Sequence, residues 1–172
     1  YDKGQGVTQD KAKAFEWYLK AANKGSVSAM FSIGWGYNKG EVVTQSMVKA
    51  YEWYLKAANN GNSAAMNNVG LCFDNGQGVT QDKAKAFEWY LKASNKGSVV
   101  AMNNVGLCYS KGEGVAQDKT QAFKWFQKSA NDGNINAMFN FGCCYDEGKG
   151  VIQDKTKAFE WWLKAANKGH MN

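Results

Sequence analysis

GNSAAMNNVGLCFDNGQGVTQDKAKAFEWYLKASNKG, residues 61–97, contains one full period of a repeat that runs along the whole chain, bounded by the equivalent glycines Gly61 and Gly97. Comparing the sequence with itself gives one dominant offset of 36 residues, without insertions. The offset superimposes five tryptophans: Trp17, Trp53, Trp89, Trp125 and Trp161. Self-similarity at such a period is typical of repeat architectures, in which each unit is one supersecondary element.

The glycines follow the same period. Eighteen of the 19 glycines occupy four positions of the repeat, and only Gly36 lies off them. Glycine is favoured where a helix ends in a left-handed residue, so the fixed positions predict helix ends. The chain has no proline, which permits uninterrupted helices between these ends.

Each period predicts two helices. The first follows an N-cap residue such as Ser26 and ends at a loop glycine such as Gly40. The second follows Asp82 or its equivalent and ends at a boundary glycine such as Gly97. We therefore predict an all-α fold, a right-handed α-solenoid of stacked helix pairs, forming a single repeat domain over residues 1–172. Its expected units are a partial repeat (1–25), four full repeats (26–61, 62–97, 98–133 and 134–169) and the start of another (170–172).

Both helices of a unit carry an apolar stripe at helical spacing, which predicts the core. Gly34 and its equivalents lie within the stripe of the first helix, although glycine costs about 1 kcal/mol in a helix interior. We expect close approach of the partner helix at Gly34 to offset that cost. In the second helix the stripe consists of Ala14, Phe15, Trp17, Tyr18, Ala21 and Ala22. Because the repeated tryptophans belong to this stripe, we expect them in the core.

The period from Gly61 to Gly97 resembles the Sel-1-like repeat, a relative of the tetratricopeptide repeat with a longer loop between its helices. The resemblance covers essentially the whole chain, as four and a half units. It rests on these residues: Ala65, Gly70, Phe73, Gly76-Gln77-Gly78-Val79, Asp82-Lys83, Ala86, Trp89-Tyr90 and Lys92-Ala93. The second repeat departs from the pattern, because Glu41-Val42-Val43 replaces the usual loop and Ser46 replaces aspartate. We expect a different local loop there.

Composition limits the classes of partner. The net charge is +6, and all of the basic residues are lysine. Lysine acts mainly as a point charge, whereas sequence-specific DNA recognition depends strongly on the bidentate arginine fork, so nucleic-acid binding is disfavoured. No stretch approaches the roughly 18 apolar residues of a membrane span. The chain begins at Tyr1 within a repeat, so we expect it to be a piece of a longer protein.

No set of residues suggests catalysis, a cofactor or a metal. The recurrent Gly-Gln-Gly-Val loops join helices, whereas a phosphate-binding loop follows a buried strand. The one histidine, His170, follows the last complete helix. The four cysteines, Cys72, Cys108, Cys143 and Cys144, are interpreted as free thiols, which favours a reducing, cytoplasmic compartment. We predict a protein that is not an enzyme and binds no cofactor or metal.

The helix face opposite the core stripe of the first helix is the predicted binding surface. In tetratricopeptide-like stacks these helices line a concave groove, and an asparagine ladder there suits the amides of an extended peptide. Aromatic residues at the two ends provide apolar anchors. The alternative is a merely solvated helix surface. The candidate peptide- or protein-binding residues are Phe31, Ser32, Trp35, Asn67, Asn68, Leu71, Asn103, Asn104, Leu107, Phe139 and Asn140.

The favoured function is a non-enzymatic scaffold or adaptor for a protein or peptide partner. An alternative is end-to-end self-association through an open repeat end, where Trp161, Trp162 and Ala165 are expected to lack cover. Another is a regulatory repeat region attached to a catalytic domain elsewhere in a longer protein, as the resemblance implies. Lysine-mediated nucleic-acid binding is the third and least favoured hypothesis, and no membrane partner is expected.

Overall fold

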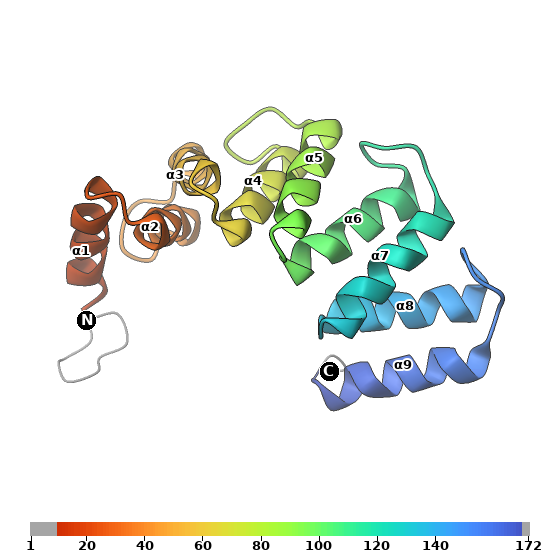
Figure 1. The fold of residues 1–172 in the computed structure, drawn as a ribbon. Coiled ribbons are helices and arrows are strands. Elements are labelled where there is room, and N and C mark those ends of the chain that lie inside the picture. The colour runs from red at the N-terminus through yellow and green to blue at the C-terminus, as the bar shows by residue number, and fades with distance from the viewer. Residues whose placement is uncertain (1–9, 170–172) are drawn as a thin grey trace. The chain divides into compact units, whose positions relative to one another are not determined.

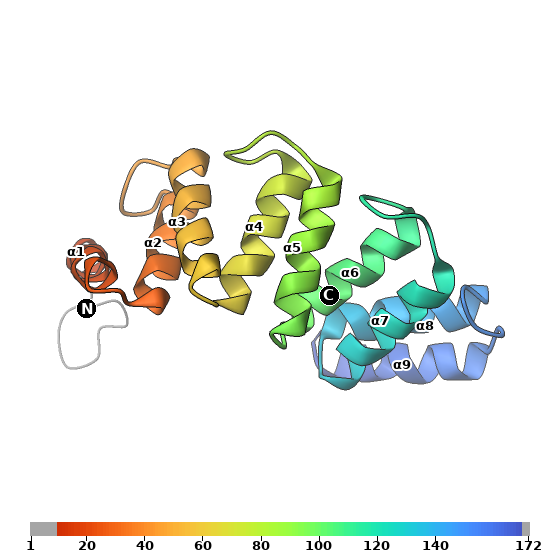
Figure 2. The same cartoon turned by 45° about the horizontal axis from the view of Figure 1, so that its top comes forward.

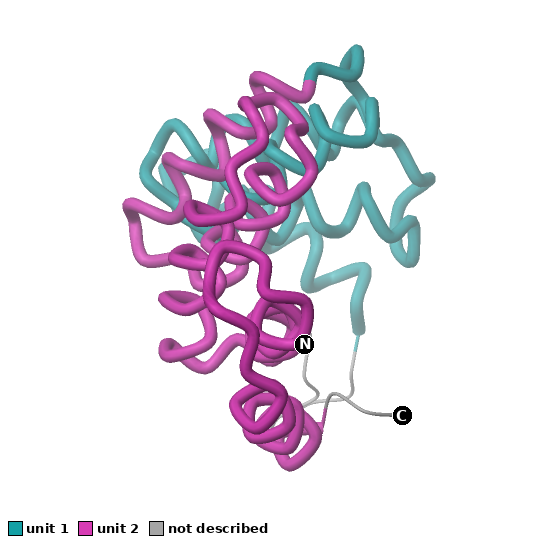
Figure 3. Tube along the Cα trace, turned by 90° about the vertical axis from the view of Figure 1, so that its right-hand side faces the viewer, with its two compact units in different colours: residues 1–82 teal, residues 83–172 magenta. Residues whose placement is uncertain are grey.

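The computed structural model of the chain describes residues 10–169. This part of the chain holds nine α-helices of 13 residues each and no strand. The chain divides into two compact units, residues 1–82 and 83–172, which Figure 3 distinguishes by colour and which are described separately.

The first unit contains four helices. They are α1 (Lys11–Asn23), α2 (Val27–Lys39), α3 (Met47–Asn59) and α4 (Ser63–Asn75). Within this unit α1 packs against α2, α2 against α3, and α3 against α4 (Figure 1).

The second unit contains five helices. They are α5 (Lys83–Asn95), α6 (Val99–Lys111), α7 (Lys119–Asn131), α8 (Ile135–Glu147) and α9 (Lys155–Asn167). Here too each helix packs on its neighbour in sequence, and α8 and α9 lie side by side (Figure 2).

The predicted helix ends are confirmed. The Ser26 Oγ accepts a hydrogen bond from the Ala29 N–H at 3.4 Å, and the Asn62 Oδ1 accepts one from Ala65 at 2.8 Å. The first helix of each pair ends at a left-handed glycine, as at Gly76 with a φ of 68°. The helix-capping residues therefore recur with the same period as the sequence.

The repeated glycine inside the first helix has the expected role. A Cβ on Gly34 would lie 2.7 Å from the Tyr54 ring, and one on Gly106 would lie 2.6 Å from the Phe126 ring. These distances are too short for carbon atoms in contact. Glycine thus lets an aromatic side chain of the following helix lie directly against the helix backbone.

A pair of aromatic rings recurs between the second helix of one repeat and the first helix of the next. The ring centroids of Phe15 and Tyr37 are 5.6 Å apart in an edge-to-face arrangement. Edge-to-face contacts suit the positive edge and negative face of aromatic rings. The same arrangement occurs in the pairs Tyr51–Phe73, Phe87–Tyr109 and Phe123–Tyr145.

The prediction that the repeated tryptophans form the core was wrong. Trp17 is 56% exposed, and its four equivalents are only half-buried. Trp53 packs against the core formed by α1 and α2, which includes residues of the preceding repeat. The buried aromatic position is the one that follows, held by Tyr54, Tyr90 and Phe126.

The apolar end of the last helix also differs from the prediction. Ala165 is fully buried and Trp161 packs on the core formed by α7 and α8, so these residues are covered. Phe159 and Leu163, one helical turn apart, are instead 65% and 49% exposed. The reason is that Trp161 and Ala165 face α8, whereas Phe159 and Leu163 face away from it.

Candidate peptide-binding face

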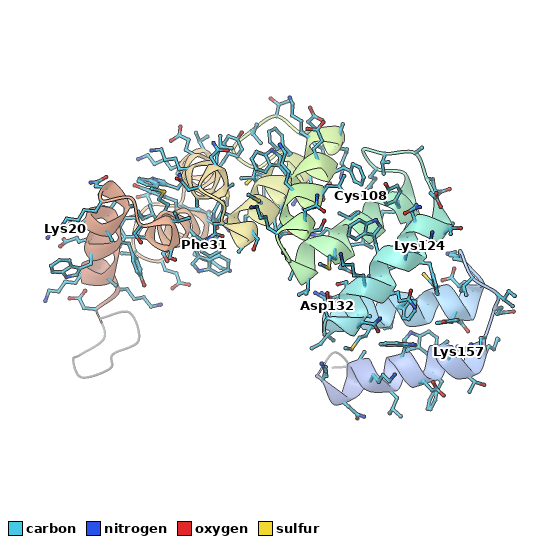
Figure 4. All side chains as sticks on the ribbon, in the orientation of Figure 1. Lys20, Phe31, Cys108, Lys124, Asp132 and Lys157 are labelled. Carbon is cyan, nitrogen blue, oxygen red and sulfur yellow. The ribbon has the colours of Figure 1, made fainter. Side chains whose placement is uncertain are left out.

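Three candidate residues of α2 line a pocket between α1 and α2. Its volume is about 380 Å³, and Phe31, Ser32 and Trp35 all line it. This volume lies in the usual range for small-ligand sites. Phe31 and Ser32 are half-buried, and Trp35 is 48% exposed, so the pocket brings together three of the residues that the sequence singled out (Figure 4, where Phe31 is labelled).

Two walls of this pocket come from residues that the sequence analysis missed. Phe15 and Tyr18 of α1 line it opposite α2, and Val42 of the following loop closes one side. We call this cavity the aromatic pocket, because Phe15, Tyr18, Phe31 and Trp35 form most of its apolar wall. The sequence treated Phe15 and Tyr18 only as core residues, although a core residue at the edge of a helix pair also faces its groove.

The aromatic pocket depends on two local departures from the repeat. At Gly36, where the other repeats have Cys72, Cys108 or Cys144, an added Cβ would lie 2.7 Å from the Phe15 ring. At the position of Val42 the next repeat has Gly78, whose Cβ would lie 2.1 Å from the Met47 carbonyl oxygen. Valine cannot follow that close path. The off-register Gly36 and the expected unusual loop were therefore the sequence signals of this pocket.

Charged residues surround the mouth of the aromatic pocket. The Lys11 ammonium lies 2.6 Å from a Glu41 carboxylate oxygen, and both side chains are about half exposed. The hydrogen bond from Lys11 is the main cause that lowers the pKa of Glu41. The Lys39 ammonium lies 4.8 Å from the centre of the Trp35 ring, on which it can act as a cation–π partner. The mouth thus offers both signs of charge around an apolar interior.

A smaller pocket of about 90 Å³ repeats this arrangement one period later. Seven of its lining residues are offset by 36 from residues of the aromatic pocket. They are Met47, Tyr54, Asn68, Leu71, Cys72, Asn75 and Gln77. We call it the Tyr54 pocket. It contains the candidate residues Asn68 and Leu71, so these two lie in a recess of the same kind as Phe31, Ser32 and Trp35.

The expectation that both asparagines of each pair face solvent was wrong. Asn67 and Asn103 are each only 6% exposed. In the second unit, Asn140 Nδ2 donates a hydrogen bond to Asn103 Oδ1 at 2.9 Å. Asn103 is therefore covered by a neighbouring helix of the same type. The second asparagine of each pair, Asn68 or Asn104, is half-buried.

The remaining candidate residues of the second unit form no comparable anchor. Leu107 packs against the core of α7 and α8. Phe139 is 37% exposed, its ring centroid lies 6.2 Å from that of Trp162, and its carbonyl oxygen accepts a hydrogen bond from the Trp162 Nε1 at 3.2 Å. The indole of Trp162 thus occupies one side of Phe139. The predicted second aromatic anchor is partly filled by the protein itself.

The thiols show the chemistry of buried groups. None of the four cysteines forms a disulfide, and Cys72, Cys108 and Cys144 are buried. Burial raises the pKa of Cys72 and of Cys144 to about 11, and it also raises that of Cys143. Since the thiolate is the nucleophile, a raised pKa makes a thiol less reactive at neutral pH. The described residues contain no cluster of three His, Cys, Asp or Glu side chains suited to a metal ion.

The fold and its periodic contacts define the class: an all-α repeat protein of helix pairs. The match to the Sel1 repeat model then assigns the chain to the Sel1 repeat family, with repeats at residues 1–26, 27–62, 63–98, 99–134 and 135–170. A search of curated protein sequences gave no match. In the described part, no helix is both long and apolar enough to cross a membrane.

Solved structures agree with this assignment. The chain is 34% identical to a Sel1 repeat protein from Oxalobacter formigenes, with a TM-score of 0.95 over 99% of this chain and 68% of that one. It is 35% identical to c5321, a protective antigen of uropathogenic Escherichia coli strains displaying an SLR fold, with a TM-score of 0.91 over 98% of this chain and 36% of that one. Helicobacter pylori cysteine rich protein B shares the fold at 24% identity, with a TM-score of 0.58 over 73% of this chain and 90% of that one. Sel1 repeats generally serve as protein-interaction scaffolds.

Proposed function

We propose that this chain is a non-enzymatic scaffold that binds a peptide segment of a partner protein along α2 and α4. The aromatic pocket holds an apolar side chain of the peptide, and Asn68 and Leu71 contact the peptide one repeat further on. The observation that carries the proposal is the 380 Å³ pocket between α1 and α2, lined by Phe15, Phe31 and Trp35.

The energetics suit a reversible adaptor. Burying one apolar side chain of the peptide contributes about 1.5–3 kcal/mol. Hydrogen bonds from a half-buried asparagine such as Asn68 add about 0.5–1.5 kcal/mol each. After the costs of association, these terms correspond to micromolar affinity, which suits a partner that must be exchanged.

The aromatic pocket can be tested with a matched pair of tryptophans. Trp35 and Trp17 are similarly exposed, and a lysine ammonium lies over each ring, at 4.8 Å and 4.5 Å respectively. Trp35 lines the pocket, whereas Trp17 is not among its lining residues. Replacing either residue with alanine removes the same side chain from a similarly exposed position, so only a role in the pocket distinguishes them.

The experiment is a selection of displayed random peptides on the full chain, followed by affinity measurements with a synthetic enriched peptide. Trp35→Ala should weaken binding by about ten-fold or more, the equivalent of one lost apolar anchor. Trp17→Ala should bind as the parent does. Failure to enrich any peptide, or equal affinities for the two variants, would contradict the proposal.

A second candidate function is self-association through α9. The exposure of Phe159 and Leu163 favours it, because two exposed apolar residues one turn apart on a helix can be buried against a second copy. Sedimentation at increasing concentration tests this function. A weight-average mass that rises with concentration, and stops rising in a Phe159→Ser/Leu163→Ser variant, would support it. A constant monomeric mass would exclude it.

A further inference from the structure

The Tyr54 hydroxyl is an unpaired polar group inside the first unit. The Tyr54 side chain is 2% exposed, and its hydroxyl has no hydrogen-bond partner. It is the one buried side-chain polar atom of the described residues in this condition. Buried hydroxyls normally find a partner, because burial removes them from water. An exception of this kind calls for a physical reason.

The position of Tyr54 is fixed by its surroundings. Its ring lies against Gly34, with no space for even a Cβ, and the Phe31 ring centroid is 5.7 Å away. The ring therefore cannot move freely to find a partner. Burial is the main cause that raises the pKa of Tyr54 to about 12, and the nearby Asn38 and Asn68 side chains oppose it. Neither of these amides lies in hydrogen-bonding geometry with the hydroxyl. The hydroxyl is thus a neutral donor held in place.

The pocket beside this hydroxyl is polar but uncharged. Four carboxamide side chains line it, and no Lys, Asp, Glu or His does. Carboxamides both donate and accept hydrogen bonds. Apolar contacts come from Met47 and Leu71. The carboxamide residues are Asn38, Asn68, Asn75 and Gln77. Such a lining suits a neutral group with both a carbonyl oxygen and an N–H, because an ion would enter without an opposite charge.

The equivalent positions of other repeats lack this combination. Phe126 has no hydroxyl, and the Trp162 Nε1 already donates to the Phe139 carbonyl oxygen. Tyr90 is equally buried, but it is not left without a partner. The aromatic pocket, one period earlier, has Lys39 and Glu41 where the Tyr54 pocket has Asn75 and Gln77. The neutral lining is therefore particular to one repeat and is not imposed by the fold.

We propose that the Tyr54 pocket is a subsite for a side-chain carboxamide, that of an asparagine or glutamine in the bound peptide. The Tyr54 O–H donates to the carboxamide oxygen, and the oxygen of Asn68 accepts from its NH₂ group. A side chain fits better than the peptide backbone, since the 90 Å³ recess admits a narrow protruding group while the backbone carries flanking substituents. The inference rests on the proposed function for its peptide ligand.

A small-molecule probe tests the subsite independently of any peptide. The full chain, labelled with ¹⁵N, is titrated with propionamide and, separately, with propionate and n-propylammonium. Propionamide should cause saturable shifts of the Asn68 side-chain amide signals, with an affinity about ten-fold or more above those of the two ions. Equal responses to the three probes, or no saturable shift with propionamide, would overturn the inference.

Two conservative variants assign the effect to the hydroxyl. Tyr54→Phe keeps the ring but removes the hydroxyl donor. The loss of this hydrogen bond should lower the affinity for propionamide by about ten-fold. Tyr90→Phe, at the same position of the next repeat, should leave the affinity unchanged. Unchanged affinity in Tyr54→Phe would overturn the inference.

The outcomes separate this inference from the proposed function. If propionamide binds as expected but no peptide is selected, the subsite stands and the peptide ligand is wrong. If a peptide binds through Trp35 but propionamide does not bind, the scaffold function stands and the subsite is wrong.

Discussion

Asn140 on α8 donates a 2.9 Å hydrogen bond to the side-chain oxygen of Asn103 on α6, and so joins the first helices of two successive pairs. Asn103 is buried, while Asn140 is half-buried. An asparagine position that the sequence assigns to ligand binding therefore serves, in the second unit, to hold one repeat against the next.

The first prediction concerns the stability contributed by this hydrogen bond. Asn103→Ala and Asn140→Ala should each lower the free energy of unfolding by about 1–3 kcal/mol, because each leaves a polar group poorly satisfied in a buried place. Urea unfolding measures the effect. The double variant should cost less than the sum of the single ones, as expected for two residues in contact. Additive effects would show that the two side chains act separately.

The second prediction concerns the helix glycines. Gly106→Ala places a Cβ 2.6 Å from the Phe126 ring, so the variant should be destabilised by about 1–3 kcal/mol through overpacking. Alanine favours helix by about 1 kcal/mol over glycine, which makes a net loss informative. Combining Gly106→Ala with Phe126→Leu should recover part of the loss in thermal unfolding. No recovery would place the strain elsewhere.

The helix glycines and the helix ends are features that the sequence could predict. Glycine is unfavourable inside a helix, so Gly34 and its equivalents predicted close packing of the partner helix. The Tyr54 ring against Gly34 and the Phe126 ring against Gly106 confirm this prediction. The ends of α4 followed in the same way from Asn62 and Gly76, since caps are local features of the chain.

The candidate face was harder to predict because burial there depends on the neighbouring repeat. Asn67 and Asn68 are adjacent and chemically identical, yet one is buried and the other half-buried. Helical periodicity predicts which face of a helix packs against its partner, but it does not predict which residues the next repeat covers. The same limit applies to Trp17 and Trp53, which share a position in the repeat: Trp17 is 56% exposed, whereas Trp53 packs against the core formed by α1 and α2.

The third prediction concerns alkaline pH. The thiols of Cys72 and Cys144 have a pKa raised from 9 to about 11 by burial, so the folded state keeps their protons longer than the unfolded state does. Their stabilising contribution is therefore complete below about pH 9 and is lost as the pH rises through about 11. At pH 10 the loss should be about 1 kcal/mol for each thiol.

Urea midpoints at pH 7.5 and pH 10 measure this loss. A Cys72→Ala/Cys144→Ala variant should show a smaller difference between the two pH values than the parent protein, even though its stability is lower at both. The same pH dependence in parent and variant would rule out the thiols as its source.

The last prediction uses stability to examine the Tyr54 hydroxyl. If this buried group has no partner in the free protein, Tyr54→Phe removes an unsatisfied hydroxyl and should raise the free energy of unfolding by about 1 kcal/mol. Tyr90→Phe is the matched control, because Tyr90 is also 2% exposed but its hydroxyl is not among the unsatisfied buried groups. The Tyr90→Phe variant should be as stable as the parent protein or less stable. Thermal and urea unfolding of both variants decide the point. A destabilised Tyr54→Phe would mean that Asn38 or Asn68 satisfies the hydroxyl in solution, and that a ligand carboxamide would have to displace an existing hydrogen bond.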